Sequence, residues 1–495
     1  MKKVFVLLLS VLAVLPLPAQ DSLYVDSLYE QSLFEQMKAG MDGHSLPLVN
    51  LTVDAAKLNR FSFVPGEIEI ADCQRRTDPS SDSVRYRCLL RIRGQKAALC
   101  DKKSFAVKLV DEESENLDAP LFGIRSENSW ILDAMAIDRI RMRNRLCFDI
   151  WNELSNTPYT TRYGNRNGTL GQFVEVFING DYNGLYCLTD KIDRRLLGLK
   201  KAKADSTGVT VRGLLYKGIS HESSHDLLSY DEADMTQGTW NAWELQYPDD
   251  YPSADTWEPL AGLIDFCSPA TGDEVFHEEY RDYFYPENLA DYHLLTVALN
   301  VVDNAYKNTF LSVVDIGREH RYLLTPWDMD GSLGSTYNGS YDETLSWIYR
   351  YQEIAPYNRL FSQRQSMDGF KGAVAERWFE LCPTLFSVDS ICRRLDDYAH
   401  MFIASGAWAR ERRKWDGNPV PLKEDIMEEL DYVKGWYARN FESICNQFER
   451  VRVSVSSPSA TRHKPSPIFD LQGRRLSGKL QKGVYIQGGK KRVVK

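Results

Sequence analysis

The first half of the chain alternates apolar and polar residues with the two-residue period of β-strands. Successive side chains of a strand point to opposite faces, so this pattern predicts sheets that bury one face. Residues 139–154 instead have apolar residues at helical spacing. Residues 179–184 contain Gly and Asn, which suit turns with positive φ, and they predict a hairpin between the last two strands. The predicted strands are residues 48–53, 67–70, 84–93, 105–110, 172–178 and 185–189.

The second half of the chain has a mainly helical pattern, with apolar residues on one face and charged residues on the other. Before it, residues 220–290 are rich in Trp, Tyr, Asp and Pro without a clear period, which predicts a loop-rich passage. The expected fold class is therefore α+β, with a strand-rich N-terminal lobe and a helical second lobe over residues 46–451. The predicted helices are residues 292–301, 370–382, 388–404 and 422–451.

The two ends of the chain have a different character. Lys2 and Lys3 precede an apolar run that ends in small residues, which is typical of a secretory signal peptide over residues 1–20. The run is shorter than the 20 or so residues that a transmembrane helix needs, and no later segment is apolar enough to span. Residues 21–45 predict a lead-in helix, and the Ser/Pro-rich residues 452–467 predict a linker. Residues 468–495 alternate strand-like runs with Gly turns and predict a small β module.

Charge and cysteine content narrow the function classes. The formal net charge is −9, with Lys and Arg spread along the chain, which argues against nucleic acid as the main partner. Nine cysteines in 495 residues are too few for a disulfide scaffold, although one or two disulfides are compatible with them. No Cys-x-x-Cys pair occurs, so neither a zinc ribbon nor a thioredoxin-type centre is supported. The sequence therefore predicts an exported protein without a transmembrane segment.

The strongest chemical signal is the run Asp303-Asn-Ala-Tyr-Lys-Asn308, followed beyond two strand-like runs by Pro326-Trp-Asp-Met-Asp330. Protein kinases use the same Asp-x-x-x-x-Asn spacing, in which the carboxylate accepts the proton of the attacking hydroxyl and the amide holds magnesium. A second carboxylate past a hairpin, here Asp328, is where kinases chelate the magnesium of the β- and γ-phosphates. Such oxygen ligands suit a hard cation.

A series of ordered motifs resembles one family. The N-terminal half contains Arg91-Ile-Arg-Gly94 and Ser104-Phe-Ala-Val-Lys108, in which Lys108 lies on the strand face opposite the apolar residues, as in the Val-Ala-Ile-Lys strand of kinases. These runs, with Trp130 to Ala134, Met142-Arg-Asn144, Ile178 to Tyr186, Leu215-Tyr-Lys-Gly218 and Pro326 to Asp330, stand in the order seen in CotH-type kinase-like proteins.

The resemblance implies an atypical protein-kinase-like fold that binds ATP with Mg²⁺ or Mn²⁺ and phosphorylates serines of secreted or coat proteins. Transferred to this sequence, it makes Asp303 the catalytic base and Asn308, Asp328 and Asp330 the metal-binding residues. It also makes five residues candidates for nucleotide contacts. Two departures concern this part of the site, because Gln95 and Asp190 stand where the family often has Asn and Glu. The five candidates are Lys108, Arg143, Asn144, Lys217 and Lys191.

Two other interpretations compete. His221-Glu-Ser-Ser-His225 matches His-Glu-x-x-His, in which His221 and His225 would bind zinc beside Glu222 in a metalloprotease. Gly218 and several serines make a helix there unfavourable, and no third ligand follows at the extended spacing. The second alternative is a catalytically inactive kinase-like protein that binds a surface partner, since ATP is scarce outside the cytoplasm. The C-terminal 28 residues resemble the ends of proteins exported by Bacteroidota, some of which are sorting signals.

Overall fold

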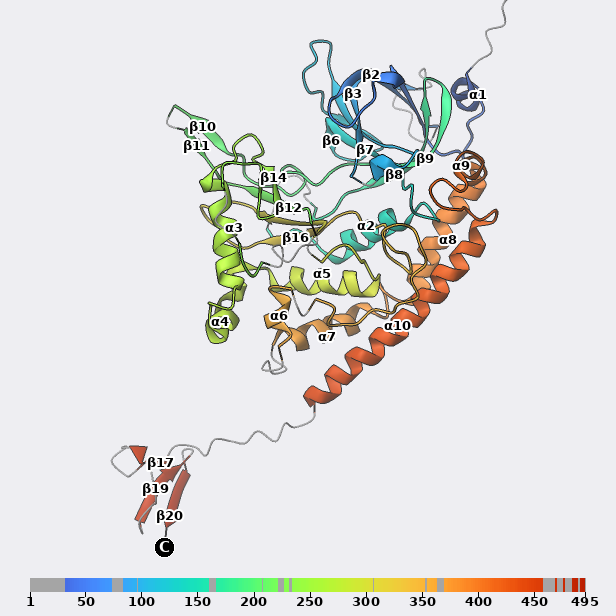
Figure 1. Cartoon of the computed structure of the whole chain (residues 1–495). Helices are drawn as coiled ribbons and strands as arrows, with labels where there is room; N and C mark the ends of the chain where they lie inside the picture. Colours follow the sequence, from blue (N-terminus) through green and yellow to red (C-terminus); the bar gives the residue numbers. More distant parts are fainter. Residues whose placement is uncertain are drawn as a thin grey trace, which may run out of the picture.

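The computed structural model describes most of the chain (Figure 1). The predicted signal peptide, most of the predicted linker and the His221–His225 motif lie outside the described residues. The described residues are 32–73, 83–95, 97–159, 166–206, 208–220, 227–230, 234–305, 307–351, 354–362, 369–456, 468–469, 475–476, 483–487 and 490–494.

Strands of the first half close into a barrel in the order β1-β2-β3-β4-β7-β9-β8 (Figure 1). β1 pairs with β8 in parallel, and this pairing closes the ring. The predicted alternation is confirmed, because Leu90, Val107 and Leu109 are buried in the barrel core while Lys108 stays partly exposed. The barrel strands are β1 (Leu48–Val53), β2 (Val64–Ala71), β3 (Val84–Arg93), β4 (Ser104–Val110), β7 (Ser129–Asp133), β8 (Gly171–Ile178) and β9 (Asp181–Thr189).

The predicted hairpin between β8 and β9 is confirmed, with a tighter turn than expected. β9 begins at Asp181, so Asn179 and Gly180 alone connect the strands, with φ of 53° and 85°. Both values lie in the left-handed region, where Asn and Gly are the tolerated residues, and such two-residue turns match the twist of a hairpin. The Asn179 side chain also accepts from the Val53 N–H and donates to the Val53 carbonyl, both at 2.9 Å. These two bonds hold the turn against β1.

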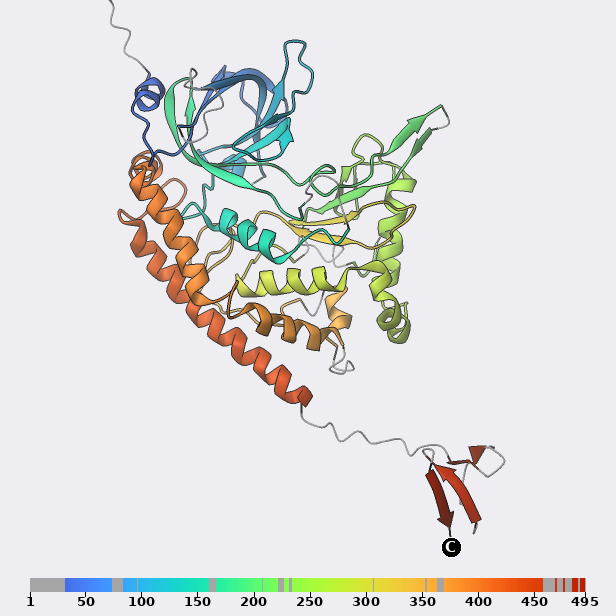
Figure 2. The ribbon, with the colours of Figure 1, turned by 180° about the vertical axis from the view of Figure 1, so that it is seen from behind.

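The second half forms a sheet and a set of helices (Figure 2). The sheet has the order β13-β14-β12-β15-β16, and α5 is buried along nearly its whole length. The long helix α10 packs against α7 and α8 (Figure 2). The sheet strands are β12 (Leu214–Gly218), β13 (Thr239–Trp240), β14 (Trp243–Tyr247), β15 (Thr309–Val313) and β16 (Leu323–Pro326). The helices are α1 (Leu33–Ala39), α2 (Arg143–Leu154), α3 (Ala254–Cys267), α4 (Asp273–Tyr283), α5 (Pro286–Ala298), α6 (Tyr357–Leu360), α7 (Phe370–Leu381), α8 (Val388–Ala404), α9 (Ala407–Trp415) and α10 (Ile426–Ser456).

Short strands complete the described chain. A four-stranded sheet at the C-terminus agrees with the strand runs predicted there, in the order β18-β17-β19-β20. None of the described helices is long and apolar enough to cross a membrane. The remaining strands are β5 (Ala119–Pro120), β6 (Ser126–Glu127), β10 (Lys203–Asp205), β11 (Gly208–Thr210), β17 (Ile468–Phe469), β18 (Arg475–Leu476), β19 (Gly483–Gln487) and β20 (Lys490–Val494).

The prediction of a loop-rich passage over residues 220–290 was wrong. This stretch contains α3, α4 and the start of α5, in addition to β13 and β14. In α3, Trp257, Leu260 and Ile264 do follow a helical spacing and are buried, but Pro259 inside the helix interrupts the pattern. Proline usually breaks a helix interior, and here the burial of the apolar face outweighs its cost. The helix predicted from residue 139 begins only at Arg143, because Arg141 has a left-handed φ of 56°.

A buried ion cluster joins the barrel to the helices. The Glu411 carboxylate on α9 accepts from Lys102 Nζ at 2.6 Å and from Arg141 Nε at 2.7 Å, and all three side chains are fully buried. The Leu185 N–H of β9 donates to its second oxygen at 2.7 Å. Burial would raise the pKa of Glu411, but the charges of Lys102 and Arg141 outweigh it and lower that pKa. Four distant segments therefore meet at one carboxylate.

Replacing this carboxylate should cost much of the stability of the protein. We expect Glu411→Gln to lower the free energy of unfolding by about 3–5 kcal/mol at pH 7. The buried Arg141 loses its counter-charge, and Lys102, whose pKa burial lowers to about 7, loses the carboxylate that favours its protonated form. Urea unfolding measures the loss, with Glu424→Gln as the control because Glu424 is 89% exposed. Because the pKa of Glu411 is lowered in the folded state, the stability that this carboxylate contributes to the wild type disappears as pH falls. The difference in unfolding free energy between wild type and Glu411→Gln should therefore shrink below about pH 4. Equal stability of the two variants at pH 7 would contradict this assignment.

Candidate functional site

The β15–β16 hairpin brings Asn308 and Asp328 together. Thr309, at the start of β15, pairs with Pro326, at the end of β16. The residues that flank this pair therefore face each other across the open end, where the Trp327 N–H donates to the Asn308 carbonyl at 2.9 Å. Asp328 follows directly. Two polar residues far apart in the sequence thus lie side by side because the strands between them pair.

The backbone at this end of the hairpin is held in an uncommon conformation. Asn308 and Asp328 have φ of 59° and 56°, in the left-handed region that Asn and Asp tolerate better than most residues. The buried Asn304 amide donates to the carbonyls of Asn308 at 2.9 Å and Trp327 at 2.8 Å. The Asn308 N–H donates to the Gly218 carbonyl at the end of β12 at 3.0 Å. The surroundings therefore fix the direction of both side chains.

Asp303 lies in the connection between α5 and β15, as the sequence predicts. The Val302 N–H donates to the Gly331 carbonyl at 3.0 Å, so the segment that carries Asp303 is bonded to the one that carries Asp330. The Asp303 carboxylate is partly exposed and lies 3.9 Å from Lys307 Nζ. This arrangement keeps a carboxylate accessible beside the metal-binding candidates.

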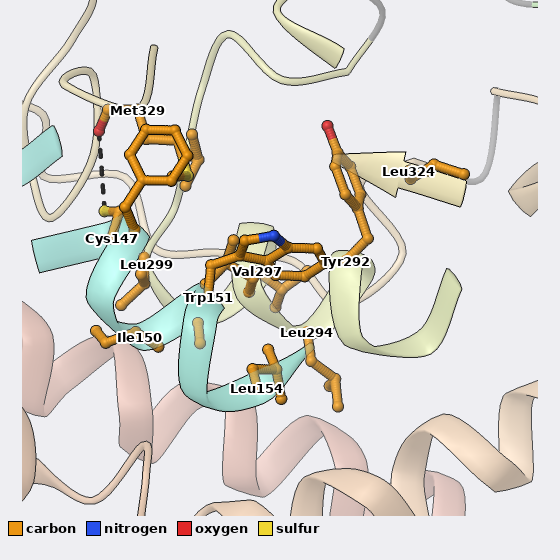
Figure 3. Packing of buried hydrophobic residues seen from close by; sticks show 14 of the residues in the cluster. Cys147, Ile150, Trp151, Leu154, Tyr292, Leu294, Val297, Leu299, Leu324 and Met329 are labelled. Carbon is orange, nitrogen blue, oxygen red and sulfur yellow. Dashed lines mark hydrogen bonds between the residues drawn. The ribbon is translucent and has the colours of Figure 1, made fainter. Parts of the chain in front are cut away.

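Hydrogen bonds from the beginning of α2 hold the segment that follows Asp328. The Asn144 amide oxygen accepts from the Met329 N–H at 3.1 Å, while its nitrogen donates to the Asp133 carboxylate at 3.0 Å. Arg143 Nε donates to the Ser332 carbonyl at 3.1 Å. In Figure 3 the Cys147 thiol points to the Met329 carbonyl, at 3.9 Å. α2 therefore holds residues 329–332 in place.

α2 is itself supported by the buried helix α5. The rings of Trp151 and Tyr292 meet edge to face with their centroids 6.0 Å apart (Figure 3). The Tyr292 hydroxyl donates to the Asn304 carbonyl at 2.9 Å, within the connection that carries Asp303. Aromatic contacts of this kind stabilise beyond the area that they bury. The packing of two helices thus positions both the Asp303 and the Asp328 segments.

Charges of both signs crowd around Asp328. Loss of surrounding water and the Asp133 carboxylate raise the pKa of Asp328, while Lys217, Arg93 and Lys307 oppose the shift. Asp328 is nonetheless accessible to solvent, so it lies at the floor of a cleft rather than in the core. Burial raises the pKa of Asp330 well above its usual range, and Asp328 and the other nearby carboxylates raise it further. The site therefore holds more negative charge than its surroundings favour.

A pocket opens where these charges meet. It is lined by Arg93, Asp133, Asn144, Trp327 and Asp328, among others. The barrel contributes Arg93 and Asp133, and the second half of the chain contributes Trp327 and Asp328. The pocket thus lies between the two parts of the molecule.

The five nucleotide-contact candidates occupy different positions. Asn144 and Lys217 lie at the site, since Asn144 bonds the Met329 N–H and the Lys217 charge acts on Asp328. Arg143 is fully buried and pairs with Asp138, so its role in the structure is to position residues 138–143 and Ser332. Lys108 Nζ lies over the Phe63 ring, 4.8 Å from its centroid. For Lys191, only its carbonyl has a described contact, which accepts from Arg125.

The neighbouring Asp190 departs from the family pattern, and it has a structural role. Its buried carboxylate accepts from Arg125 at 2.9 Å and from Arg166 at 3.1 Å. It also accepts from the Leu170 N–H at 2.9 Å. Burial raises the pKa of Asp190, and the two arginines act in the opposite direction. In this chain the residue after β9 therefore pairs with arginines of the barrel side.

The oxygen atoms of the site suit a hard divalent cation. Asn308, Asp328 and Asp330 supply amide and carboxylate oxygens, the ligands that magnesium prefers. The Asn308 amide nitrogen and the Asn304 amide oxygen are buried there without a hydrogen-bond partner in the part of the chain that the structure describes. Among the described residues no three His, Cys, Asp or Glu side chains form a metal-binding group by themselves. Phosphate oxygens and water would have to complete the shell.

Sequence reasoning missed two residues of the site. Asp133 and Arg93 were part of quoted motifs, but neither was named as a candidate. Each is the last residue of a barrel strand, β7 and β3, and both line the pocket. The available signal was a charged residue at the end of an otherwise apolar strand, which is common at strand ends. Because Asp133 and Arg93 are far from Asp328 in the sequence, the sequence did not indicate that the three residues line one pocket.

The fold and the site together define an α+β protein with a carboxylate-rich cleft flanked by cations. The family model for the CotH kinase protein matches residues 90–444. Because the match covers most of the chain, the protein belongs to the CotH family, which confirms the resemblance noted in the sequence. No curated protein matches the chain. Family membership indicates atypical kinase chemistry in general terms, and the matched range includes every site candidate.

The crowded carboxylates predict a stabilising substitution. The pKa of Asp330 is higher in the folded than in the unfolded state, so its deprotonated form opposes folding at neutral pH. We expect Asp330→Asn to increase the free energy of unfolding by on the order of 1 kcal/mol at pH 7.5. The gain should shrink as pH falls toward about 4, the ordinary pKa of Asp in the unfolded chain, below which the side chain is protonated in both states.

Chemical unfolding in EDTA measures this change. Glu112→Gln is the control, because Glu112 is exposed and does not line the pocket. A loss of stability in Asp330→Asn at pH 7.5 would show instead that an internal partner already compensates the Asp330 charge.

Proposed function

We propose that this protein is an exported atypical kinase that transfers the γ-phosphoryl group of ATP to a hydroxyl, with a serine of a secreted or surface protein as the acceptor. Mg²⁺ or Mn²⁺ is the metal in this proposal. Membership of the CotH family supports the general chemistry. The predicted signal peptide and the Bacteroidota-like C-terminal residues support export.

The observation that carries the proposal is the pairing of Asn308 with the Asp328 segment. Their side chains leave the open end of one hairpin, with the backbone of both residues left-handed and bonded through Trp327. Asp303 lies in the same connection as Asn308 and is bonded through its neighbour Val302 to Gly331. A carboxylate, an amide and a second carboxylate thus lie on neighbouring segments joined by backbone hydrogen bonds, and these are the groups that phosphoryl transfer uses.

Each residue then has a defined role. The acceptor hydroxyl oxygen attacks the γ-phosphorus, and the new P–O bond forms as the bond to the β,γ-bridging oxygen breaks. The Asp303 carboxylate takes the hydroxyl proton, and ADP leaves with the bridging oxygen. Asn308, Asp328 and Asp330 would hold the divalent cation, which withdraws negative charge from the phosphate oxygens when bound. Asn144 keeps Asp133 and the Met329 backbone in place.

An inactive binding protein is the main competing interpretation. Such a protein has no need for a carboxylate in each of these positions, and the charge crowding at Asp328 and Asp330 costs stability. The retention of both carboxylates together with Asp303 therefore favours activity. The zinc-protease alternative rests on His221, Glu222 and His225, which lie outside the described residues.

Conservative substitutions test the assignment. We expect Asp303→Asn and Asp328→Asn each to lower transfer of label from γ-labelled ATP by about 10²-fold or more, through loss of the base and of a metal ligand respectively. Asp250→Asn, at an exposed position of a loop, should behave as wild type. Mass spectrometry of the acceptor mixture identifies the modified side chain.

The Asp328→Asn variant should also bind Mn²⁺ more weakly in the presence of ATP, whereas Asp303→Asn should keep this affinity. Equal labelling by wild type and both variants, or no labelling of any protein acceptor by wild type, would exclude the proposed kinase activity. Retained nucleotide binding without transfer would favour the inactive binding protein.

A further inference from the structure

The cation that the barrel presents to the site is Arg93. It is the last residue of β3 and pairs with Ser104 at the start of β4, so it lies at the barrel end that faces Asp328. Its guanidinium carbon lies over the Trp327 ring, 5.5 Å from the centroid. A guanidinium stacked in this way keeps its N–H groups in its own plane, where they can bind an anion at two points.

Among the described residues, the Arg93 side chain forms no hydrogen bond or ion pair. Nevertheless it lines the pocket together with Asp133 and Asp328. Loss of surrounding water lowers the pKa of Arg93, and the two carboxylates act in the opposite direction. Its donors therefore have no described protein partner where they line the pocket. A ligand with several acceptor oxygens would satisfy them.

Lys108, the residue suggested by the kinase strand pattern, lies elsewhere. It pairs with Leu89 in the β3–β4 ladder, four residues along β3 from Arg93. At about 3.4 Å per residue this separates their backbones by roughly 13 Å, more than the length of a lysine side chain. Its ammonium shares the Phe63 ring with Arg91, each 4.8 Å from the ring centroid. Lys108 and Arg93 therefore serve different parts of the surface.

A second cation lies on the neighbouring sheet. Lys217 on β12 pairs across the sheet with Glu244 and precedes Gly218, whose carbonyl accepts from the Asn308 N–H at 3.0 Å. The charges of Asp328, Arg93, Glu244 and Lys307 act on it. The Lys217 ammonium lies 5.8 Å from the centroid of the Phe310 ring. Two cations from separate sheets thus flank the same carboxylate.

We propose that Arg93 binds the phosphate groups of the nucleotide from the barrel side, opposite Lys217, and that Lys108 does not. This inference rests on the proposed function and adds the residue that recognises the polyphosphate. Because Arg93 and Lys217 belong to separate sheets, a nucleoside triphosphate would bridge the two parts of the protein. The same chemistry predicts a preference for ATP and ADP over adenosine.

Calorimetric titration of the full chain with MgATP, MgADP and adenosine tests the inference. Arg93→Gln should weaken binding of MgATP by about tenfold or more and leave adenosine affinity within about twofold of wild type. Arg93→Lys keeps the charge but loses the two-point geometry, so it should show an intermediate loss. Lys108→Gln is the matched control on the neighbouring strand and should bind all three ligands as wild type does.

The outcomes separate this inference from the proposed function. If wild type binds MgATP and transfers phosphate while Arg93→Gln binds MgATP equally well, the role of Arg93 is excluded and the kinase proposal stands. An equal loss of adenosine and MgATP affinity in both Arg93 variants would indicate a structural role instead. A loss in Lys108→Gln alone would assign the phosphates to Lys108. Failure of wild type to bind any of the nucleotides would overturn both proposals.

Discussion

The buried Glu411 carboxylate is the interaction on which the site depends. It pairs with Lys102 before β4 and with Arg141 before α2, and it accepts from the Leu185 N–H in β9. Arg141 also donates to the carbonyls of Met135, Ala136 and Asp138, which fixes the left-handed turn that ends at α2. α2 begins two residues later, and Asn144 in its first turn bonds both Asp133 and Met329. A charge on α9, far from the cleft, thereby sets the position of the backbone beside Asp328. Buried ion clusters of this kind often add little net stability, but they tolerate few alternative arrangements.

Several interactions within the site are locally destabilising. Asp133, Asp328 and Asp330 influence one another, and Asn308 and Asp328 both have left-handed backbones. Such strain and like-charge crowding persist only where the surrounding structure enforces them, and they are typical of sites that bind an ion or a charged substrate. Here the enforcement comes from Asn304, from the β15–β16 pairing and from α2. Arg93, Lys217 and Lys307 provide opposite charge near Asp328. A bound cation and a polyphosphate would compensate the charges of the site that the protein groups alone leave uncompensated.

Local sequence pattern predicted the regular elements well where burial is one-sided. β1, β3 and α8 begin and end where the periodicity indicates, because a strand or helix with one buried face must repeat its apolar residues at a fixed interval. The pattern failed over residues 220–290, where aromatic residues and Pro259 concealed α3. It also missed α9, a short helix whose arginines and lysine dominate its composition, although its Glu411 holds the buried cluster. In both cases tertiary contacts, rather than local propensity, decide that a helix forms.

The sequence by itself determined the α+β class, the family resemblance and the identity of Asp303, Asn308 and Asp328 as candidates. These rest on spacing within short segments, where the residues themselves carry the signal. Only the tertiary structure decided which other side chains share the cleft. Asp133 and Arg93 reach Asp328 because two strands of the barrel end at the same edge, whereas Lys108 lies four residues along β3 from that edge and Arg143 is buried in an ion pair. Contacts of this kind depend on how a closed barrel meets a separate sheet, and that geometry is not encoded in any single stretch of the chain.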